Sequence, residues 1–230
     1  MAMLRKIFNS LFSKQEKNYS DSYYYDYYYR STDATENLYR VIKTKAFEVP
    51  VSNVLHTSEY ISQFHTLHFL ENENQIKKKL GSPSKVTKVD IVKDITLTKI
   101  SYRNFVPNLN INISYYLLDD CFYFGLLESR NEFVDMPFAF HPILQAIEDK
   151  YHIKIRRILE KDGYVNIFQA ITIVDPDNNM IVIERDSKLR LYYLSGSIYF
   201  YKMIYDIENG IEIEKENLKE LRQSLLKKIV

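Results

Sequence analysis

The sequence predicts an α+β protein in which antiparallel β meanders are each preceded by a helix. Alternating apolar and polar residues form consecutive strands joined by tight turns, whereas parallel strands would need a crossover helix between each pair. Segments with helical spacing precede two such series of strands. The sequence therefore predicts two similar helix-plus-sheet units, and it leaves open whether they form one domain and whether they are an internal duplication.

The composition is that of a globular protein. The chain has 230 residues, of which 46% are hydrophobic and 27% are charged, so it is long enough to bury a sizeable core. Its formal charge of +1 gives no overall field that would attract nucleic acid. The single cysteine, Cys121, lies in an apolar run, and we expect it to be a buried and unreactive residue in a reducing compartment.

Residues 1–36 are predicted to form an amphipathic helix followed by a tyrosine-rich arm. Apolar residues recur at helical spacing between Leu4 and Phe12, while Asn9 and Ser10 interrupt the apolar stretch that a secretory signal would need. We therefore expect a cytoplasmic location. The arm contains a dense group of aromatic residues, namely Tyr23, Tyr24, Tyr25, Tyr27, Tyr28 and Tyr29.

The first helix-plus-sheet unit is predicted to span residues 37–135, beginning with two short strands. Ser58 is a suitable N-cap for a helix that ends near Leu70, and Gly81 ends a second helical segment that starts at Glu73. The apolar period then changes to two, which indicates strands. These strands are expected at residues 86–102, with a break at Asp94, and at residues 109–117 and 122–126, with Asp119-Asp120 as the turn between the last two.

The second unit is predicted to span residues 136–230. Pro142 suits the first turn of a helix that continues to Tyr151. Asn209-Gly210 predicts a hairpin that pairs a strand at residues 198–207 with residues 211–213, and a C-terminal helix follows. The remaining strands are expected at residues 153–159, 164–174, 180–185 and 189–194, with turn formers at residues 175–179.

The common motifs of nucleotide and metal chemistry are missing from the sequence. With five glycines, the chain has no Gly-rich phosphate loop, and it has no HExxH, GxSxG or CxxC motif. His56, His65 and His68 are close in sequence, but no carboxylate follows them at a metal-ligand spacing. We therefore expect no metal and no cofactor.

One short string has the spacing of a catalytic motif. Pro176-Asp177 is followed by Asp186-Ser187-Lys188, and this string resembles the PD-(D/E)xK pattern of a large nuclease superfamily. The resemblance implies that Asp177 and Asp186 would hold Mg²⁺ and that Lys188 would position or activate the attacking water for phosphodiester hydrolysis. Two hairpin turns explain the same residues without a metal.

The tyrosine-rich arm is the one segment of the chain that building a fold does not by itself require. Tyrosine combines a large apolar surface with a hydroxyl group, which suits protein interfaces. Stacking on nucleic acid would need a cationic groove, but only Lys17 and Arg30 bracket the tyrosine-rich arm. A second concentration comprises Tyr192-Tyr193 and the predicted strand that contains Tyr199 and Tyr201, which face one way and either cover the core or form a binding surface.

The expected function is therefore non-catalytic binding of another protein, as an immunity or inhibitor-like protein or as a subunit of a larger assembly. The predicted contact surfaces are an aromatic-rich sheet face with Tyr199 and Tyr201, and the N-terminal arm with its six tyrosines at positions 23–29. Two alternatives are the metal-dependent nuclease with Asp177, Asp186 and Lys188, and attachment to a membrane surface through residues 1–17.

Overall fold

The computed structural model describes residues 53–92, 95–106, 109–129, 140–156, 169–185, 188–213 and 215–229. The chain divides into two compact units, Met1–Val49 and Pro50–Val230, and every described residue belongs to the second unit. The predicted N-terminal helix, the tyrosine-rich arm and the first two short strands lie outside the described residues. The α+β class is confirmed, because the described residues form an eight-stranded sheet, a two-stranded sheet and four helices.

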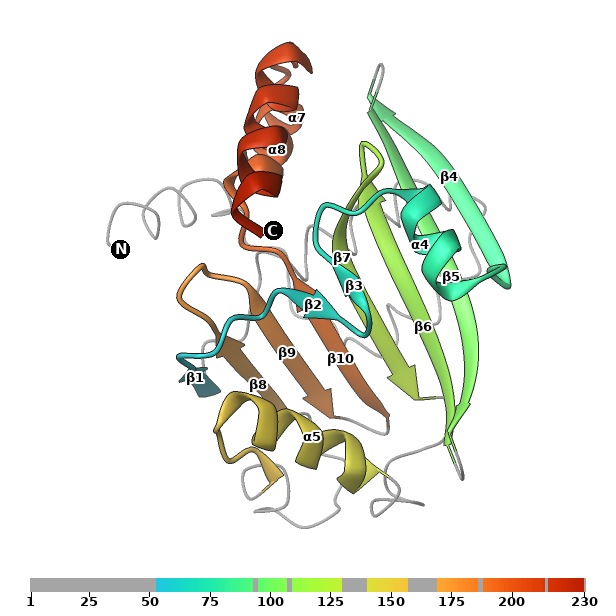
Figure 1. Cartoon of the computed structure of the whole chain (residues 1–230), viewed down its shortest axis with the longest axis vertical. Helices are drawn as coiled ribbons and strands as arrows, with labels where there is room; N and C mark the ends of the chain where they lie inside the picture. The colour runs from blue at the N-terminus through green and yellow to red at the C-terminus, as the bar shows by residue number, and fades with distance from the viewer. Residues whose placement is uncertain are drawn as a thin grey trace, which may run out of the picture. The chain divides into compact units, whose positions relative to one another are not determined.

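The large sheet has the strand order β1-β8-β9-β10-β7-β6-β5-β4 (Figure 1). All neighbouring strands are antiparallel except β1 and β8, which are parallel. Strand β10 pairs with β7, so strands from the two predicted units belong to one continuous sheet. The strands are β1 (Val54–His56), β4 (Lys85–Val92), β5 (Ile95–Val106), β6 (Leu109–Leu118), β7 (Cys121–Ser129), β8 (Gln169–Val174), β9 (Met180–Arg185) and β10 (Leu189–Leu194).

Local sequence patterns account for most of these strands. Alternation in β6 buries Ile111, Ile113 and Tyr115, which belong to the same core cluster. The predicted turn between β6 and β7 is confirmed, since Asp119 and Asp120 have φ values of 50° and 56°. Two consecutive residues with positive φ form the type of tight turn whose twist matches that of the flanking antiparallel strands.

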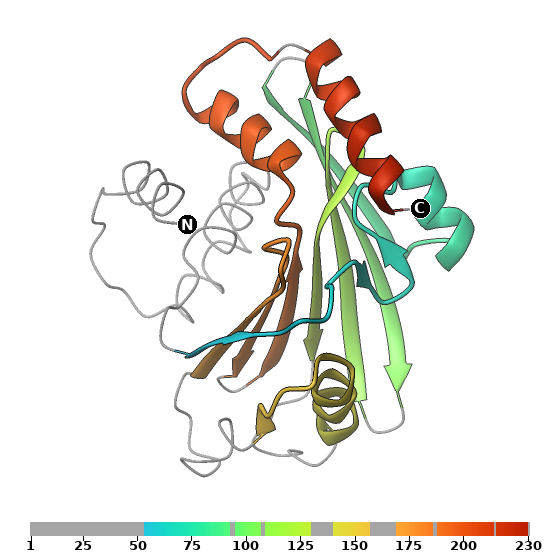
Figure 2. The ribbon, with the colours of Figure 1, turned by 60° about the vertical axis from the view of Figure 1, so that its left-hand side comes forward.

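Two helices and a small two-stranded sheet lie on the same face of the large sheet (Figures 1 and 2). The helices are α4 (Glu73–Leu80) and α5 (His141–Tyr151), and the small sheet pairs β2 (Gln63–Phe64) with β3 (Leu67–His68). Their apolar side chains join the core cluster of the large sheet. The contributing residues are Phe64, Leu67, Ile76, Leu144, Ile147 and Tyr151.

The predicted helix with Ser58 as its N-cap is wrong. Residues after Ser58 instead form the β2–β3 hairpin, in which Phe64 pairs with Leu67 across a turn where His65 has a φ of 60°. Apolar residues three positions apart share a helix face, but they also face the same way when a two-residue turn separates them. The local pattern therefore fits both structures, and packing against the large sheet decides between them.

The predicted strand at residues 198–207 is also wrong, because this segment is helix α7 (Ile198–Glu208). Ser197 caps it by accepting a hydrogen bond from the Tyr199 backbone N–H at 3.3 Å. The buried residues of α7 recur at helical spacing, as Tyr199 and Phe200 are followed by Met203 and Ile204. A short run of aromatic and β-branched residues satisfies a strand pattern as well, so the sequence signal was ambiguous.

The hairpin predicted at Asn209-Gly210 is also wrong, because the segment predicted as its first strand is helix α7. Gly210 has a φ of 63° and follows the end of α7, which is a usual position for glycine beyond a helix C-terminus. Residues 211–213 form no strand, and neither do residues 153–156 after α5. The predicted C-terminal helix is confirmed as α8 (Lys215–Ile229). None of the helices described combines the length and apolar character that a membrane span requires.

Candidate functional site

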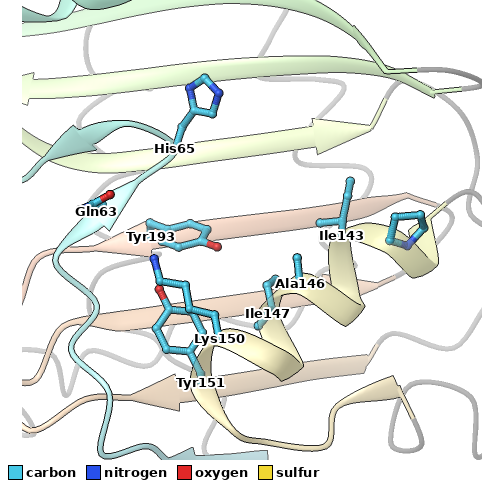
Figure 3. A pocket seen from close by; sticks show the side chains of 9 residues that line it. Gln63, His65, Ile143, Ala146, Ile147, Lys150, Tyr151 and Tyr193 are labelled. Carbon is cyan, nitrogen blue, oxygen red and sulfur yellow. The ribbon is translucent and has the colours of Figure 1, made fainter.

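A groove lies on the covered face of the large sheet, between strand β2 and helix α5 (Figure 3). It has a volume of about 360 Å³, and Tyr193 of β10 forms its floor. Three segments that are far apart in the sequence supply the lining. These residues are Gln63, His65, Pro142, Ile143, Ala146, Ile147, Lys150, Tyr151 and Tyr193.

Helix α5 provides one wall of the groove. Ile143, Ala146, Ile147 and Lys150 line it, and their spacing of three or four residues places them along one side of the helix. Pro142 lies in the first turn as predicted, where its missing N–H costs no hydrogen bond. The Thr57 hydroxyl donates to the backbone carbonyl of Tyr151 at 2.9 Å, so the C-terminal end of α5 is fixed to the chain that follows β1.

The buried carboxylate of Glu148 holds the chain that leaves α5. It accepts hydrogen bonds from the backbone N–H groups of Ile155 and Arg156 at 2.7 and 2.9 Å, and from Arg156 Nε at 2.8 Å. Burial alone would raise the pKa of Glu148, but these hydrogen bonds and the Arg156 charge outweigh it and hold the pKa below the ordinary value. The charged form is therefore the one that the fold stabilises.

We expect Glu148→Gln to lower the free energy of unfolding by about 2 kcal/mol at pH 7, because the amide oxygen still accepts from the backbone N–H groups but the negative charge and the acceptor for Arg156 Nε are lost. A lowered pKa in the folded state means that this contribution is complete above the unfolded pKa and disappears as the pH falls through the folded pKa. Urea unfolding of wild type and variant at pH 7 and at pH 3 measures the loss of stability and its dependence on pH. The difference between wild type and variant should shrink at pH 3, and an unchanged difference would contradict the assignment.

The β2–β3 hairpin provides the other wall. The Phe64 ring centroid lies 4.7 Å from that of Tyr193 and 5.4 Å from that of Tyr115. His65 lies at the turn, and its Nδ1 atom is 3.4 Å from the Tyr115 hydroxyl. Burial, with a smaller contribution from Tyr102, raises the pKa of Tyr115, so this phenol stays protonated.

Two tyrosines and a lysine supply the polar groups beside the apolar floor. Burial is the main reason why the pKa of Tyr193 is raised and why that of Tyr151 is raised to about 12. Tyr151 is 2% exposed, and its hydroxyl has no hydrogen-bond partner in the described part of the chain. Lys150 Nζ lies 5.3 Å from the centroid of the Tyr151 ring, so an ammonium group is close to this phenol (Figure 3).

The structure does not bring the nuclease-like residues together. Asp177 lies in the exposed turn between β8 and β9, whereas Lys188 lies between β9 and β10. These positions are at opposite ends of β9, whose six residues span roughly 20 Å. Asp186 lies outside the described residues. Within the described ranges, no group of three or more His, Cys, Asp or Glu side chains is placed to hold a metal ion.

Tyr199 and Tyr201, the two predicted contact residues of the aromatic sheet face, do not line the groove. Tyr199 is 2% exposed and lies in α7, with its hydroxyl 3.5 Å from the Cys121 sulfur. Tyr201 is partly buried in the same helix. Burial raises the pKa of the Cys121 thiol to about 11, which agrees with the prediction of a buried and unreactive cysteine. Tyrosines 23–29 lie outside the described residues.

The groove was not predicted from the sequence, although Tyr193 belongs to the second concentration of aromatic residues described above. Lys150 and Tyr151 were visible only as the end of a predicted helix, and His65 only as a histidine without ligand spacing. Comparisons of the chain with protein family models, with curated proteins and with solved structures each find no match. The fold and the groove therefore define the class, an α+β protein with an open aromatic groove on one sheet face.

Proposed function

We propose that the protein is a non-catalytic binding protein and that its groove receives an extended segment of another protein. The observation that supports this most directly is the opening between β2 and α5, which leaves the Tyr193 ring accessible in the middle of the sheet (Figure 3). Aromatic side chains with a polar tip are well suited to such contacts. Immunity, inhibitor and assembly-subunit roles in the cytoplasm are all forms of this proposal.

The edge of β2 favours a protein segment as the occupant. Among the described strands β2 pairs only with β3, and the two residue pairs are Gln63 with His68 and Phe64 with Leu67. The other edge of β2 faces α5 across the groove (Figures 1 and 3). An open strand edge presents backbone N–H and C=O groups that an incoming extended segment pairs with, while pockets beside it receive alternate side chains.

The tyrosine phenols of the groove favour binding over catalysis. Acid–base or nucleophilic catalysis by a tyrosine needs a phenol whose pKa is brought down toward the working pH. The pKa values of the Tyr151 and Tyr193 phenols are shifted in the opposite direction by burial. The lining residues include no carboxylate and no thiol. Because Asp177 and Lys188 are separated by the length of β9, we do not advance the nuclease as a second function.

Peptide-display selection against the full chain tests the proposal. We expect selected peptides to bind with micromolar dissociation constants, and we expect Ala146→Trp to weaken them at least about tenfold, because the indole fills the groove. Isothermal titration calorimetry of each peptide with the wild type and with Ala146→Trp measures the two dissociation constants. Asp149→Trp is the matched control, since Asp149 is an exposed residue of α5 that does not line the groove.

Two outcomes would count against this function. In the first, the selected peptides bind Ala146→Trp as tightly as the wild type, so the groove is not their site. In the second, native mass spectrometry of the purified full chain finds a tightly held small molecule that Ala146→Trp excludes, while no peptide binds. The groove would then be a small-molecule site.

We further propose that the chain consists of two helix-plus-meander units, residues 37–135 and 136–230, joined edge to edge. The element order supports this, since α4 comes before β4–β7 and α5 comes before β8–β10. The pairing of β7 with β10 would be the junction of the two meanders. In this arrangement the groove lies where the two units meet, which is a common location for binding sites.

A further inference from the structure

We propose that the segment bound in the groove presents a carboxylate beside an apolar side chain, and that Lys150 and Tyr151 recognise this carboxylate together. The inference rests on the proposed function, because it assigns a chemistry to the occupant of the same groove. The carboxylate belongs either to an acidic side chain or to the C-terminus of the segment. Both sources offer the same two oxygen acceptors.

The Tyr151 hydroxyl is the first observation behind this assignment. The hydroxyl is buried, the Tyr151 side chain lines the groove and no described residue accepts the hydrogen bond of the hydroxyl. A buried donor without a partner costs free energy, and such groups are rare in folded proteins. With its pKa raised to about 12, the phenol remains a hydrogen-bond donor at neutral pH. An acceptor atom that enters the groove would satisfy it.

Lys150 provides the charge at the same end of the groove. Its ammonium lies 5.3 Å from the centre of the Tyr151 ring, and no described carboxylate pairs with it. The other polar lining residues are Gln63, His65 and Tyr193, so no acidic group lies in the groove to oppose an anion. Hydrogen bonds from an ammonium and a phenol to one carboxylate are stronger than bonds to a neutral acceptor.

One buried carboxylate, that of Asp175, lies near Tyr151 and is already paired with other groups of the protein. The charge of Asp175 contributes to the raised pKa of Tyr151, so the two groups are near each other. The Asp175 oxygens already accept from the Ile61 backbone N–H at 2.7 Å and from the Asn179 backbone and side chain at 2.8 and 2.9 Å. The positive charge of Lys150 would offset the repulsion that Asp175 exerts on a second anion.

The remaining lining explains the apolar part of the occupant. Ile143, Ala146 and Ile147 line one side of the groove, and the Tyr193 ring lies at its floor. A volume of about 360 Å³ accommodates one aromatic or large aliphatic side chain together with a neighbouring carboxylate. The apolar and anionic parts of the occupant thus have separate places in one groove.

Two small probes with the same apolar body test the inference. We expect 3-phenylpropionate to bind the full chain about fivefold more tightly than 3-phenylpropionamide at pH 7 and low salt. Chemical-shift titrations at millimolar probe concentration, followed at the amides of Ala146 and Tyr193, give both dissociation constants. In Lys150→Gln the preference for the carboxylate should disappear, while Lys154→Gln, which removes an exposed lysine outside the groove, should retain it.

Tyr151→Phe provides a second and independent readout. We expect it to weaken 3-phenylpropionate binding by about threefold to tenfold, since one hydrogen bond is lost. It should leave the unfolding midpoint unchanged or raise it, because the hydroxyl has no described partner in the free protein. A merely structural hydroxyl would give the reverse, with lower stability and unchanged binding, and that result would overturn the assignment.

The outcomes separate this inference from the proposed function. Equal binding of the two probes in the wild type would overturn carboxylate recognition, and so would a preference that survives in Lys150→Gln. Failure of both probes to bind at millimolar concentration would also overturn it. Display-selected peptides that depend on Ala146 would still support the binding groove in each of these cases.

Discussion

Gly125→Ala is expected to lower the free energy of unfolding by about 3 kcal/mol, although alanine is favoured over glycine in a strand. Gly125 pairs with Tyr115 on β6 and with Tyr193 on β10, directly beneath the β2–β3 hairpin. A Cβ atom there would lie 2.1 Å from Phe64 Cδ1 and 2.5 Å from Cε1. The Phe64 ring is 3% exposed and is packed against both tyrosines, so it moves only if the hairpin lifts.

A double-mutant cycle with Phe64→Ala distinguishes this clash from a general loss of strand stability. We expect Gly125→Ala to cost much less in the Phe64→Ala background, because alanine lacks the ring atoms that the Cβ would meet. Urea unfolding of the four proteins measures the coupling free energy. Additive costs would contradict the proposed contact. Lifting the hairpin also moves the β2 wall, so Gly125→Ala should weaken groove-binding peptides.

Asp175→Ala is expected to have an effect of similar size, about 3 kcal/mol of unfolding free energy. The Asp175 side chain is buried and joins the turn after β8 to the chain that enters β2. Its removal leaves the backbone N–H of Ile61, a fully buried residue, without its acceptor, and it also frees both donors of Asn179. Buried donors that lose a charged acceptor account for most of the expected cost.

Asp177→Ala is the matched control, because it removes a carboxylate from the same turn at an exposed position. We expect this variant to change the unfolding free energy by no more than about 0.5 kcal/mol. Asp175→Asn should be intermediate, since its amide oxygen keeps one acceptor. Chemical denaturation of the three variants tests the order. Equal losses for Asp175→Ala and Asp177→Ala would show that the buried hydrogen bonds contribute little.

Local patterns in the sequence were sufficient for several elements. Alternation placed the strands of β4–β7, and Asp119-Asp120 gave the turn between β6 and β7. Pro142 marked the start of α5, and Gly81 marked the end of α4, where it has a φ of 79° and donates its N–H to the Lys77 carbonyl. These signals work because caps, turns and periodicity act within a few residues of the chain.

The candidate site was not accessible to the same reasoning. Gln63, Lys150 and Tyr193 line one groove although well over a hundred residues separate the first from the last. Each has an ordinary local explanation in a strand, a helix or a sheet. Nothing in the sequence around Tyr151 indicates that its hydroxyl would be buried without a described partner. Only the packing of α5 and the β2–β3 hairpin on the same sheet face brings these groups together.

The sequence by itself determined the α+β class, most of the strands, the helices α4, α5 and α8, and the burial of Cys121. The tertiary structure decided that residues 63–68 form a hairpin and residues 198–208 a helix, that β10 pairs with β7, and that a groove opens beside Tyr193. Short apolar runs satisfy helix and strand patterns equally well, so contacts with distant parts of the chain select one of them. Strand order and grooves depend entirely on such contacts, which local propensity does not encode.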